Sequence, residues 1–374
     1  MNNERQDSRV RSQGQVVSVQ SAAGSGKVLL LALTVHLFAF APFHLSIAQA
    51  QPITLTQALN QSFSTGPDMS IARANLAQAQ ANRKAQEADP SSPEDLLVRV
   101  RNAERLAQVR VEQAQRETLQ NVLGVYLGIA EVQQSLEVLL AQVTFNGRNL
   151  EVARSRLGNK VGTPLDVSRA ENTLAGSRQL VANTQSQLPV LTTRLETLLG
   201  LNANANPAVV PLGEVQERPL DLRTLSSGLL DRLPSVVEVR NGLVEAELAV
   251  KLTDNDYTPE LTKREALTLR NNARLGLRAA EQAAAANLAD AFRAALDAQQ
   301  QIQIRSRDLA NASEGHRQNQ IRLNAGTISG LQLQGSELEL RSARLQLVQA
   351  QYAYLRALAA LSVAAGQDVT GLVK

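Results

Sequence analysis

Residues 122–143, VLGVYLGIAEVQQSLEVLLAQV, contain a regular stripe in which the steps alternate between four and three residues. The stripe positions are Val122, Tyr126, Ile129, Gln133, Leu136, Leu140 and Val143. An average step of about 3.5 residues is typical of helices that pack as coiled coils. The stretch therefore predicts a helix that packs against other helices along its length.

The same stripe recurs 166 residues later in the chain. Its positions there are Leu288, Phe292, Ala295, Gln299, Ile302, Ser306 and Leu309. Upstream, residues 52–84 align with residues 219–251 at an offset of 167, and Pro67 meets Pro234. Unrelated helices would not agree in this way, so the chain contains an internal duplication. We expect helical repeats over 51–205 and 206–374.

A glycine-containing turn follows each stripe: RLGNKVGTPLD over 156–166 and RLNAGTISGL over 322–331. Glycine adopts the positive φ that turns need, and threonine is a good N-cap. The residues to which we assign these turn-forming roles are Gly158, Gly162, Gly326, Thr163 and Thr327.

Each repeat is thus predicted to hold one long helix, a tight turn and an antiparallel return helix. The first long helix should run from near Glu94 to near Leu157, and the second from near Pro259 to near Leu323. At a rise of 1.5 Å per residue the first would be on the order of 95 Å long. A lone helix of that composition needs lateral packing to be stable.

Composition supports an all-α fold. Aromatic residues make up only 3% of the chain and tryptophan is absent, whereas a membrane β-barrel is rich in both β-branched and aromatic residues. The chain also has no cysteine, which excludes disulfides, thiolate metal sites and cysteine nucleophiles. The formal charge of +3 is too small to predict a nucleic-acid partner.

The first fifty residues have the layout of a secretory signal peptide. Four basic residues precede or open the apolar run from Val28 to Phe43, and an A-x-A pattern follows at Ala48 to Ala50. The run is shorter than the roughly 20 residues that cross a bilayer. We therefore expect residues 1–50 to be a signal peptide and the remaining chain to be exported.

No residue set predicts catalysis, a cofactor or a metal. His316 has no partner histidine or cysteine and should be solvated on a helix face. Tyr126, Phe292, Tyr352 and Tyr354 fall on apolar stripes and should serve in packing. The acidic residues are dispersed among arginines, as on solvated helix faces. We therefore expect a protein that is not an enzyme.

The ordered set of features resembles the outer membrane efflux protein (TolC-like) family. It comprises the duplication, residues 54–59 (TLTQAL) before Pro67, the Tyr126 region, both turns, residues 165–167 with Glu171, and the closing helix over 350–366. The resemblance implies a TolC-like α-barrel protomer, a homotrimer, a collar over 202–219, and docking to a periplasmic adaptor and inner-membrane pump. It places the chain in the outer membrane or periplasm of a Gram-negative-type envelope.

The resemblance also implies where the adaptor docks. The predicted docking tip comprises Arg156, Leu157, Gly158, Gly162, Thr163, Arg322, Leu323, Gly326 and Thr327. Asp166, in the first turn of the return helix, is the candidate gate residue. Arginine is also favoured at helix C-termini by the helix dipole, so an ordinary structural role remains open for the arginines.

Two short connections depart from the family pattern. In that family a pair of long strands separates the second and third helices of each repeat. Here residues 88–93 and about 253–259 stand in their place, and a membrane-spanning strand alone needs about 9–11 residues. We therefore expect the β-barrel hairpins to be absent. Two functions follow: an efflux component with a helical tunnel, or a non-conducting scaffolding protein of the cell envelope built on the same tube.

Overall fold

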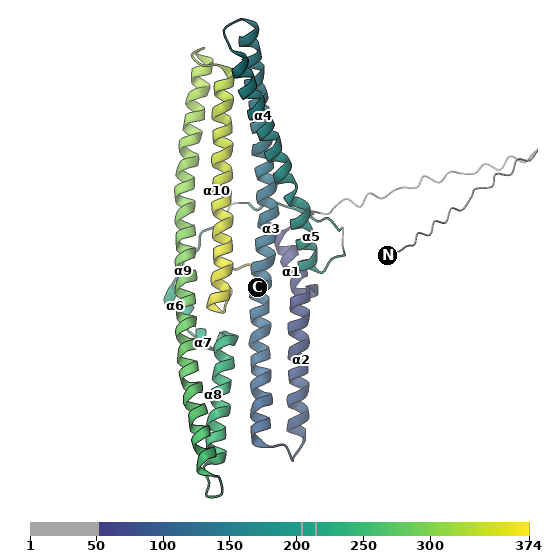
Figure 1. Cartoon of the computed structure of the whole chain (residues 1–374), viewed down its shortest axis with the longest axis vertical. Helices are drawn as coiled ribbons and strands as arrows, with labels where there is room; N and C mark the ends of the chain where they lie inside the picture. The colour runs from purple at the N-terminus through teal and green to yellow at the C-terminus, as the bar shows by residue number, and fades with distance from the viewer. Residues whose placement is uncertain (1–51, 203–204, 214, 374) are drawn as a thin grey trace, which may run out of the picture. The chain divides into compact units, whose positions relative to one another are not determined.

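The computed structural model describes residues 52–202, 205–213 and 215–373 (Figure 1). The predicted signal peptide, residues 1–50, lies outside the described residues. In the first repeat the elements are β1 (Pro52–Ile53), α1 (Leu55–Thr65), α2 (Pro67–Ala88), α3 (Glu94–Gly158), α4 (Pro164–Gln185) and α5 (Gln187–Leu199). In the second they are β2 (Ala208–Val209), α6 (Leu222–Ser226), α7 (Leu229–Arg232), α8 (Pro234–Thr253), α9 (Glu260–Asn324) and α10 (Gly330–Ala365).

The two long helices, α3 and α9, each contain 65 residues. Both begin directly after a proline, Pro93 or Pro259, whose fixed φ suits the residue before a helix. Their ends at Gly158 and Asn324 lie one residue beyond the predicted ends. The predicted all-α fold with long antiparallel helices in two repeats is therefore confirmed.

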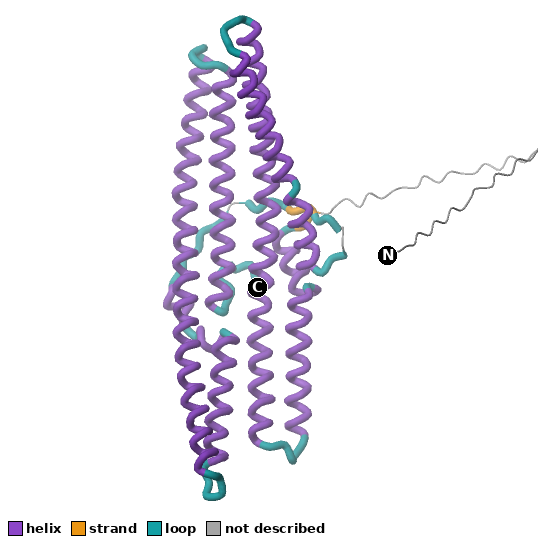
Figure 2. The backbone as a smooth tube through the Cα atoms, in the orientation of Figure 1, coloured by secondary structure: helices purple, strands orange, loops and turns teal. Residues whose placement is uncertain are grey.

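Helix α3 is the centre of the packing. It packs against α2, α4, α5, α8 and α10, while α9 packs against α8 and α10. Figure 2 shows these helices running nearly side by side, with short loops joining successive helices at either end. Each long helix thus forms one hairpin with the helix before it and another with the helix after it. This arrangement gives the long stripes the lateral partners that they need.

Two apolar clusters form the core. The first joins α1, α3 and α5 to one side of α10, and its fully buried members include Leu119, Leu123, Tyr126 and Tyr352. The second joins α9 to the other side of α10 and to α6 and α7, around Leu288, Ala295, Tyr354 and Leu358. Both apolar sides of α10 are therefore covered within one chain.

Three buried tyrosines hold the segment between the repeats. The Tyr126 hydroxyl lies 2.9 Å from the Ile53 carbonyl oxygen and 2.7 Å from that of Val210. Ile53 belongs to β1 and Val210 directly follows β2, so this hydroxyl links α3 to the parallel pair. From α10, two further tyrosine hydroxyls accept backbone N–H groups of the same segment: Tyr352 from Leu212 at 3.2 Å and Tyr354 from Arg218 at 3.1 Å. These residues were predicted only to pack, yet they also bind the linker by hydrogen bonds.

The two return helices differ. Helix α10 is continuous over 36 residues, whereas the first return helix is interrupted at Ser186 and divides into α4 and α5. Pro189 lies in the first turn of α5 and has no N–H to donate to the preceding turn. The aligned position in the second repeat is Leu355, which continues the helix. This local substitution accounts for the asymmetry.

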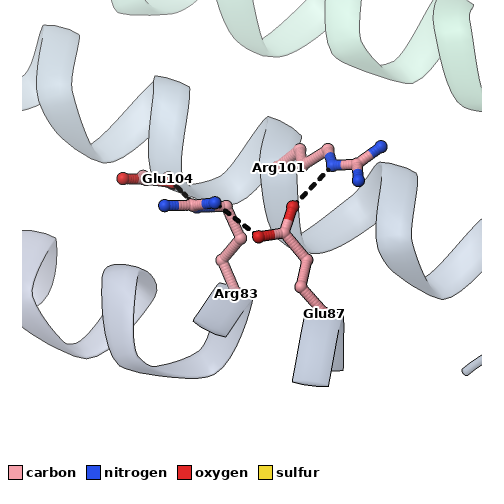
Figure 3. Close-up of polar contacts among 4 residues, drawn as sticks. All are labelled: Arg83, Glu87, Arg101 and Glu104. Atoms are coloured by element: carbon pink, nitrogen blue, oxygen red, sulfur yellow. Dashed lines mark hydrogen bonds and ion pairs between the residues drawn. The ribbon is translucent and has the colours of Figure 1, made fainter. Parts of the chain in front are cut away.

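At the end opposite the tip turns, ion pairs hold the α2–α3 hairpin together (Figure 3). Arg83 pairs with Glu87 at 2.5 Å and also with Glu104 of α3, and Arg101 of α3 pairs with Glu87 at 2.9 Å. Helix α8 joins this end through Lys251, whose ammonium lies 3.7 Å from Glu94. Ion pairs thus connect α2 to α3 and α8 to α3 at this end.

Within the described residues the only strands are β1 and β2, each of two residues. Residues 89–93 and 254–259 connect α2 to α3 and α8 to α9 directly, as the short gaps predicted. In the part of the chain that the structure describes, no helix has both the length and the apolar character to cross a membrane.

Candidate functional site

The two tip turns, residues 159–163 and 325–329, lie at the same end of the helical hairpins (Figure 1). The first joins α3 to α4 and the second joins α9 to α10. Helices α3 and α9 have equal lengths and begin at the same end, and in Figure 1 the α3–α4 turn stands beyond the α9–α10 turn. All nine residues of the predicted docking tip fall in these turns or at the helix ends beside them.

Both long helices end in the same hydrogen-bond pattern. At the first turn, the Val161 N–H donates to the Arg156 carbonyl at 2.9 Å, and the Lys160 N–H donates to that of Leu157 at 3.0 Å. At the second turn, the N–H groups of Thr327 and Gly326 donate to the carbonyls of Arg322 and Leu323, each at 2.9 Å. This is the Schellman closure, which satisfies the last carbonyls of a helix.

The closure requires one residue with left-handed backbone. In the second turn it is Gly326, with φ of +71°, as predicted. In the first turn it is Lys160, with φ of +61°, so the assignment of positive φ to Gly158 and Gly162 was wrong. Gly158 is the last helical residue of α3. The turn reaches its left-handed position two residues later than the first glycine suggested.

Gly162 has a different structural role. A Cβ placed on it would lie 3.0 Å from the Arg156 Cβ and 3.1 Å from the Leu157 nitrogen. Those separations are tighter than most Cβ contacts, so a side chain at residue 162 would require the turn or the end of α3 to shift by a few tenths of an ångström. The glycine permits close approach of two backbone segments rather than an unusual φ.

The helix caps agree with the sequence at one turn and differ at the other. Thr163 is the N-cap of α4, and its hydroxyl accepts the Asp166 N–H at 3.2 Å. In the second turn Ser329, not Thr327, caps α10, with Gln332 completing the capping box. The Thr327 hydroxyl instead donates to the Arg322 carbonyl at 2.9 Å, so Thr327 belongs to the closure of α9.

Asp166 completes the first capping box. Its carboxylate accepts the Thr163 hydroxyl at 2.7 Å and the Thr163 N–H at 3.0 Å. These hydrogen bonds hold the pKa of Asp166 below its ordinary value, with a smaller contribution from the positive charges of Arg169 and Arg156. Asp166 is therefore an anion that starts α4, and its predicted role in gating stays a prediction.

The surface of the tip combines arginine with exposed apolar side chains. Arg156 and Arg322 are exposed. Val161 is 75% exposed and Leu165 is 57% exposed, while Ile321 stands on the last turn of α9 with 55% exposed. The predicted docking tip did not include these three apolar residues. Their type was visible in the sequence, but their position at the end of a hairpin, with nothing covering them in one protomer, was not.

His316 lies away from the tip, in the upper part of α9. Its Nδ1 is 3.1 Å from the hydroxyl oxygen of Ser336 on α10, so it is partly buried between helices rather than fully solvated. The same hydroxyl also lies 2.8 Å from the Leu333 carbonyl oxygen. The described residues contain no group of three histidine or acidic side chains arranged to hold a metal ion.

The comparisons with known proteins point in one direction. The sequence model of the outer membrane efflux protein family matches residues 261–367, which lie in the second repeat. No curated protein sequence matches the chain. Similarity to solved structures is broader and covers both repeats.

Three of these structures illustrate the likeness. The outer membrane protein VceC from Vibrio cholerae has a TM-score of 0.64 at 14% identity, over 84% of this chain and 96% of that one. The outer membrane channel CmeC of Campylobacter jejuni has 0.65 at 10% identity, over 83% and 85%. The outer-membrane channel OprN has 0.62 at 18% identity, over 83% and 89%.

The resemblance to the outer membrane efflux protein family is therefore confirmed, by sequence over residues 261–367 and by fold over most of the described chain. The matches are to efflux and channel proteins, in agreement with the expectation that the chain is not an enzyme.

Proposed function

We propose that this chain, a relative in fold of outer membrane efflux channels, is a component of an efflux or secretion system. In this proposal it is exported to the outer membrane or periplasm and forms a homotrimeric helical tunnel. Its tip turns dock a periplasmic adaptor, which connects the tunnel to an inner-membrane pump.

The observation that carries the proposal is the matched pair of tip turns. Two helical hairpins present arginine beside exposed apolar side chains at the same end of the chain. An apolar patch with a charged rim is a common composition for a protein-binding surface. The structural role of the backbone is already met by the Schellman closures, which do not require the exposed side chains of Val161, Leu165 or Arg322.

Support for a trimer comes from apolar side chains that one chain leaves uncovered. Leu269 and Leu275 on α9 are 61% and 63% exposed. On the first return helix, Leu180 of α4 is 50% exposed and Val190 of α5 is 69% exposed. In Figure 1, α9 lies at one flank of the helical layer and α5 at the other. Copies placed side by side would cover both flanks.

Crosslinking from the tip tests adaptor docking. A photo-crosslinking residue would replace Val161, with Ile71 on α2 as a matched site that is 60% exposed but lies in the opposite half. We expect residue 161, and not residue 71, to capture a single periplasmic protein in intact cells. Charge reversal of both tip arginines, Arg156→Glu with Arg322→Glu, should abolish that capture. Equal capture from both sites, or capture that survives charge reversal, would contradict docking at the tip.

Sedimentation of the mature chain at micromolar concentration tests the tube separately. We expect a trimer, because the flanking leucines and valine would otherwise stay in water. A stable monomer would rule out the closed tube while leaving the docking experiment unaffected.

The alternative function is a non-conducting scaffold of the cell envelope. The specific observation in its favour is the direct joining of α2 to α3 and of α8 to α9, with the charge network of Arg83 and Glu87 beside the first connection. The two functions differ in a cell-based measurement. Deletion of an efflux component raises the intracellular accumulation of exported dyes, whereas loss of a scaffold changes envelope integrity without a dye-specific effect.

A further inference from the structure

Arg116, in the N-terminal half of α3, is a charged residue with a buried side chain. Its exposed fraction is 7%, although nearby arginines of the same helix, such as Arg110, extend into solvent. A guanidinium keeps its charge in a protein, so burying it costs free energy unless acceptors and an opposite charge surround it.

The partners that the chain provides for Arg116 are incomplete. The nearest carboxylate is that of Glu112, 3.8 Å from Nη1, and the Glu112 side chain is itself 59% exposed. Nη2 donates to the Arg232 carbonyl at 3.3 Å, and Nε is buried without a hydrogen-bond partner. Burial is the main reason that the pKa of Arg116 lies below its ordinary value. The interior therefore leaves this cation short of negative charge.

A second guanidinium adds to the excess of positive charge. The Arg232 side chain donates to the carbonyls of Leu225 at 3.0 Å and Ser227 at 2.7 Å, and to the side-chain amide oxygen of Gln367. These acceptors are neutral. The charge of Arg232 also disfavours the charged form of Arg116. The carboxylates that act on Arg116, those of Glu112 and Glu117, both belong to exposed residues, so no buried carboxylate faces the two cations.

Arg116 lines a cavity of about 520 Å³ between α3, α8, α9 and α10. Volumes of about 300–1,000 Å³ are usual for small-molecule sites. Beside Arg116 the wall carries the polar side chains of Gln113, Gln120, Ser235 and Asn287. The remaining wall is apolar and built largely from alanines of α9 and α10, with Val363.

We propose that this cavity binds a small amphiphilic carboxylate. The carboxylate group accepts hydrogen bonds from Arg116, and a short apolar chain lies along the alanines. The planar guanidinium matches the two oxygens of a carboxylate, which makes this pairing one of the stronger hydrogen-bonded contacts in proteins. A cationic ligand would be repelled by the two guanidinium groups, and a neutral alcohol would leave their positive charge uncompensated. The proposal does not depend on adaptor docking, which concerns the opposite end of α3.

Titration calorimetry on the full mature protein tests this site, with hexanoate as the probe. Acetate lacks the apolar chain and hexanol lacks the charge, so each isolates one half of the interaction. We expect one hexanoate per chain, with acetate and hexanol each at least about tenfold weaker, as loss of a charged hydrogen bond or of several buried methylenes implies. Acetate or hexanol binding as tightly as hexanoate would overturn the proposal.

Amino-acid substitutions test whether hexanoate binds beside Arg116. Arg116→Met should weaken hexanoate at least about tenfold. Arg99→Met, at a position on α3 that is 61% exposed, should leave it unchanged. If Arg116→Met does not fold, as judged by circular dichroism, Ala283→Leu serves instead. That change narrows the cavity from an exposed position of α9 and should also weaken hexanoate. Unaltered binding in the folded variant, or no hexanoate binding to the unmodified protein, would refute the site.

Discussion

Lys160 and Gly326 occupy the same place in the two tip turns, and both have left-handed backbone, with φ of +61° and +71°. They are separated by 166 residues, the offset that aligns the two helical stripes. The duplication has therefore preserved the backbone conformation of the turn while the residue that adopts it differs. Left-handed backbone is sterically unfavourable for lysine, which has a Cβ, but not for glycine.

Exchanging these residue types should change stability in opposite directions. We expect Lys160→Gly to raise the free energy of unfolding by about 1 kcal/mol, because relief of left-handed strain exceeds the entropy lost with glycine. Gly326→Ala should lower it by about 1 kcal/mol. Urea unfolding followed by circular dichroism measures both. A destabilised Lys160→Gly protein would show that the lysine side chain makes a compensating contact.

The caps of the return helices give a second prediction. Ser329→Ala should destabilise the protein by about 1 kcal/mol, because it removes the acceptor for the Gln332 N–H at the start of α10. Thr327→Ala should cost less, since the Thr327 N–H already donates to the same Arg322 carbonyl as its hydroxyl. Thermal unfolding of the two single variants compares them directly. A larger loss in Thr327→Ala would contradict the assignment of Ser329 as the cap.

Removal of one hydroxyl should loosen the segment between the repeats. Tyr126 is fully buried, and burial raises the pKa of its phenol, so the group is a neutral donor at physiological pH. The Ile53 carbonyl keeps the N–H donor of Val210 at 3.3 Å, so Tyr126→Phe chiefly removes the donor of the Val210 carbonyl and should cost about 1–3 kcal/mol.

Tyr257→Phe is the matched control for that change, because Tyr257 is 97% exposed in the α8–α9 connection. It should leave the unfolding free energy unaltered. Hydrogen exchange should show faster exchange at residues 205–213 in Tyr126→Phe alone. Equal effects of the two substitutions would show that the hydrogen bonds of Tyr126 contribute nothing.

The charge network beside the α2–α3 connection predicts a pH dependence. The pKa of Glu87 is lowered from its ordinary value near 4.5, chiefly by the hydrogen bond from Arg101 and also by the charges of Arg83 and Arg101. A lowered folded-state pKa means that the carboxylate stabilises the fold above about pH 4.5, and that this stabilisation disappears as the pH falls below it.

Glu87→Gln should therefore lower the melting temperature relative to the unmodified protein at pH 7, and the difference should shrink at pH 3. Differential scanning fluorimetry at low salt measures both, since salt screens exposed pairs. Because Glu87 is exposed, we expect a small shift. A difference that is constant from pH 7 to pH 3 would show that ionisation of Glu87 has no part in it.

Much of the fold was accessible from periodicity. The stripe from Val122 to Val143 and its copy predicted both long helices, whose ends at Gly158 and Asn324 lie within one residue of expectation. A stripe of this length predicts both the helix and the face that it buries, because each further turn places another residue of the stripe on the same face. The turns that interrupt it were equally visible, since they combine glycine with capping residues.

Individual residues inside the turns were harder to assign. Glycine at 158 and 162 suggested positive φ there, but the hydrogen-bond closure placed the left-handed residue at Lys160. Which residue becomes left-handed depends on where the helix stops, and a difference of one or two residues moves it. The break at Ser186 was also missed, because Pro189 is tolerated in the first turn of a new helix as readily as it interrupts an old one.

The cavity beside Arg116 could not be predicted from the sequence, for another reason. Arg116 falls between glutamine and glutamate residues and looks like any solvated helix position. Its burial depends on α8 and α10 covering that face of α3, which only the tertiary arrangement reveals. The tyrosine hydrogen bonds to residues 53, 210, 212 and 218 have the same origin, because they connect segments that are distant in the sequence.

The equal lengths of α3 and α9 restrict how this chain can evolve. One extra heptad in α3 alone would raise its turn by about 10.5 Å, at 1.5 Å per residue, and leave the second turn behind. The same heptad in both arms of both hairpins would keep the present spacing of the two turns. Insertions and deletions in the long helices should therefore be tolerated only when all four arms change together. Point substitutions, such as lysine in place of glycine at the turn, can accumulate in one repeat at a time.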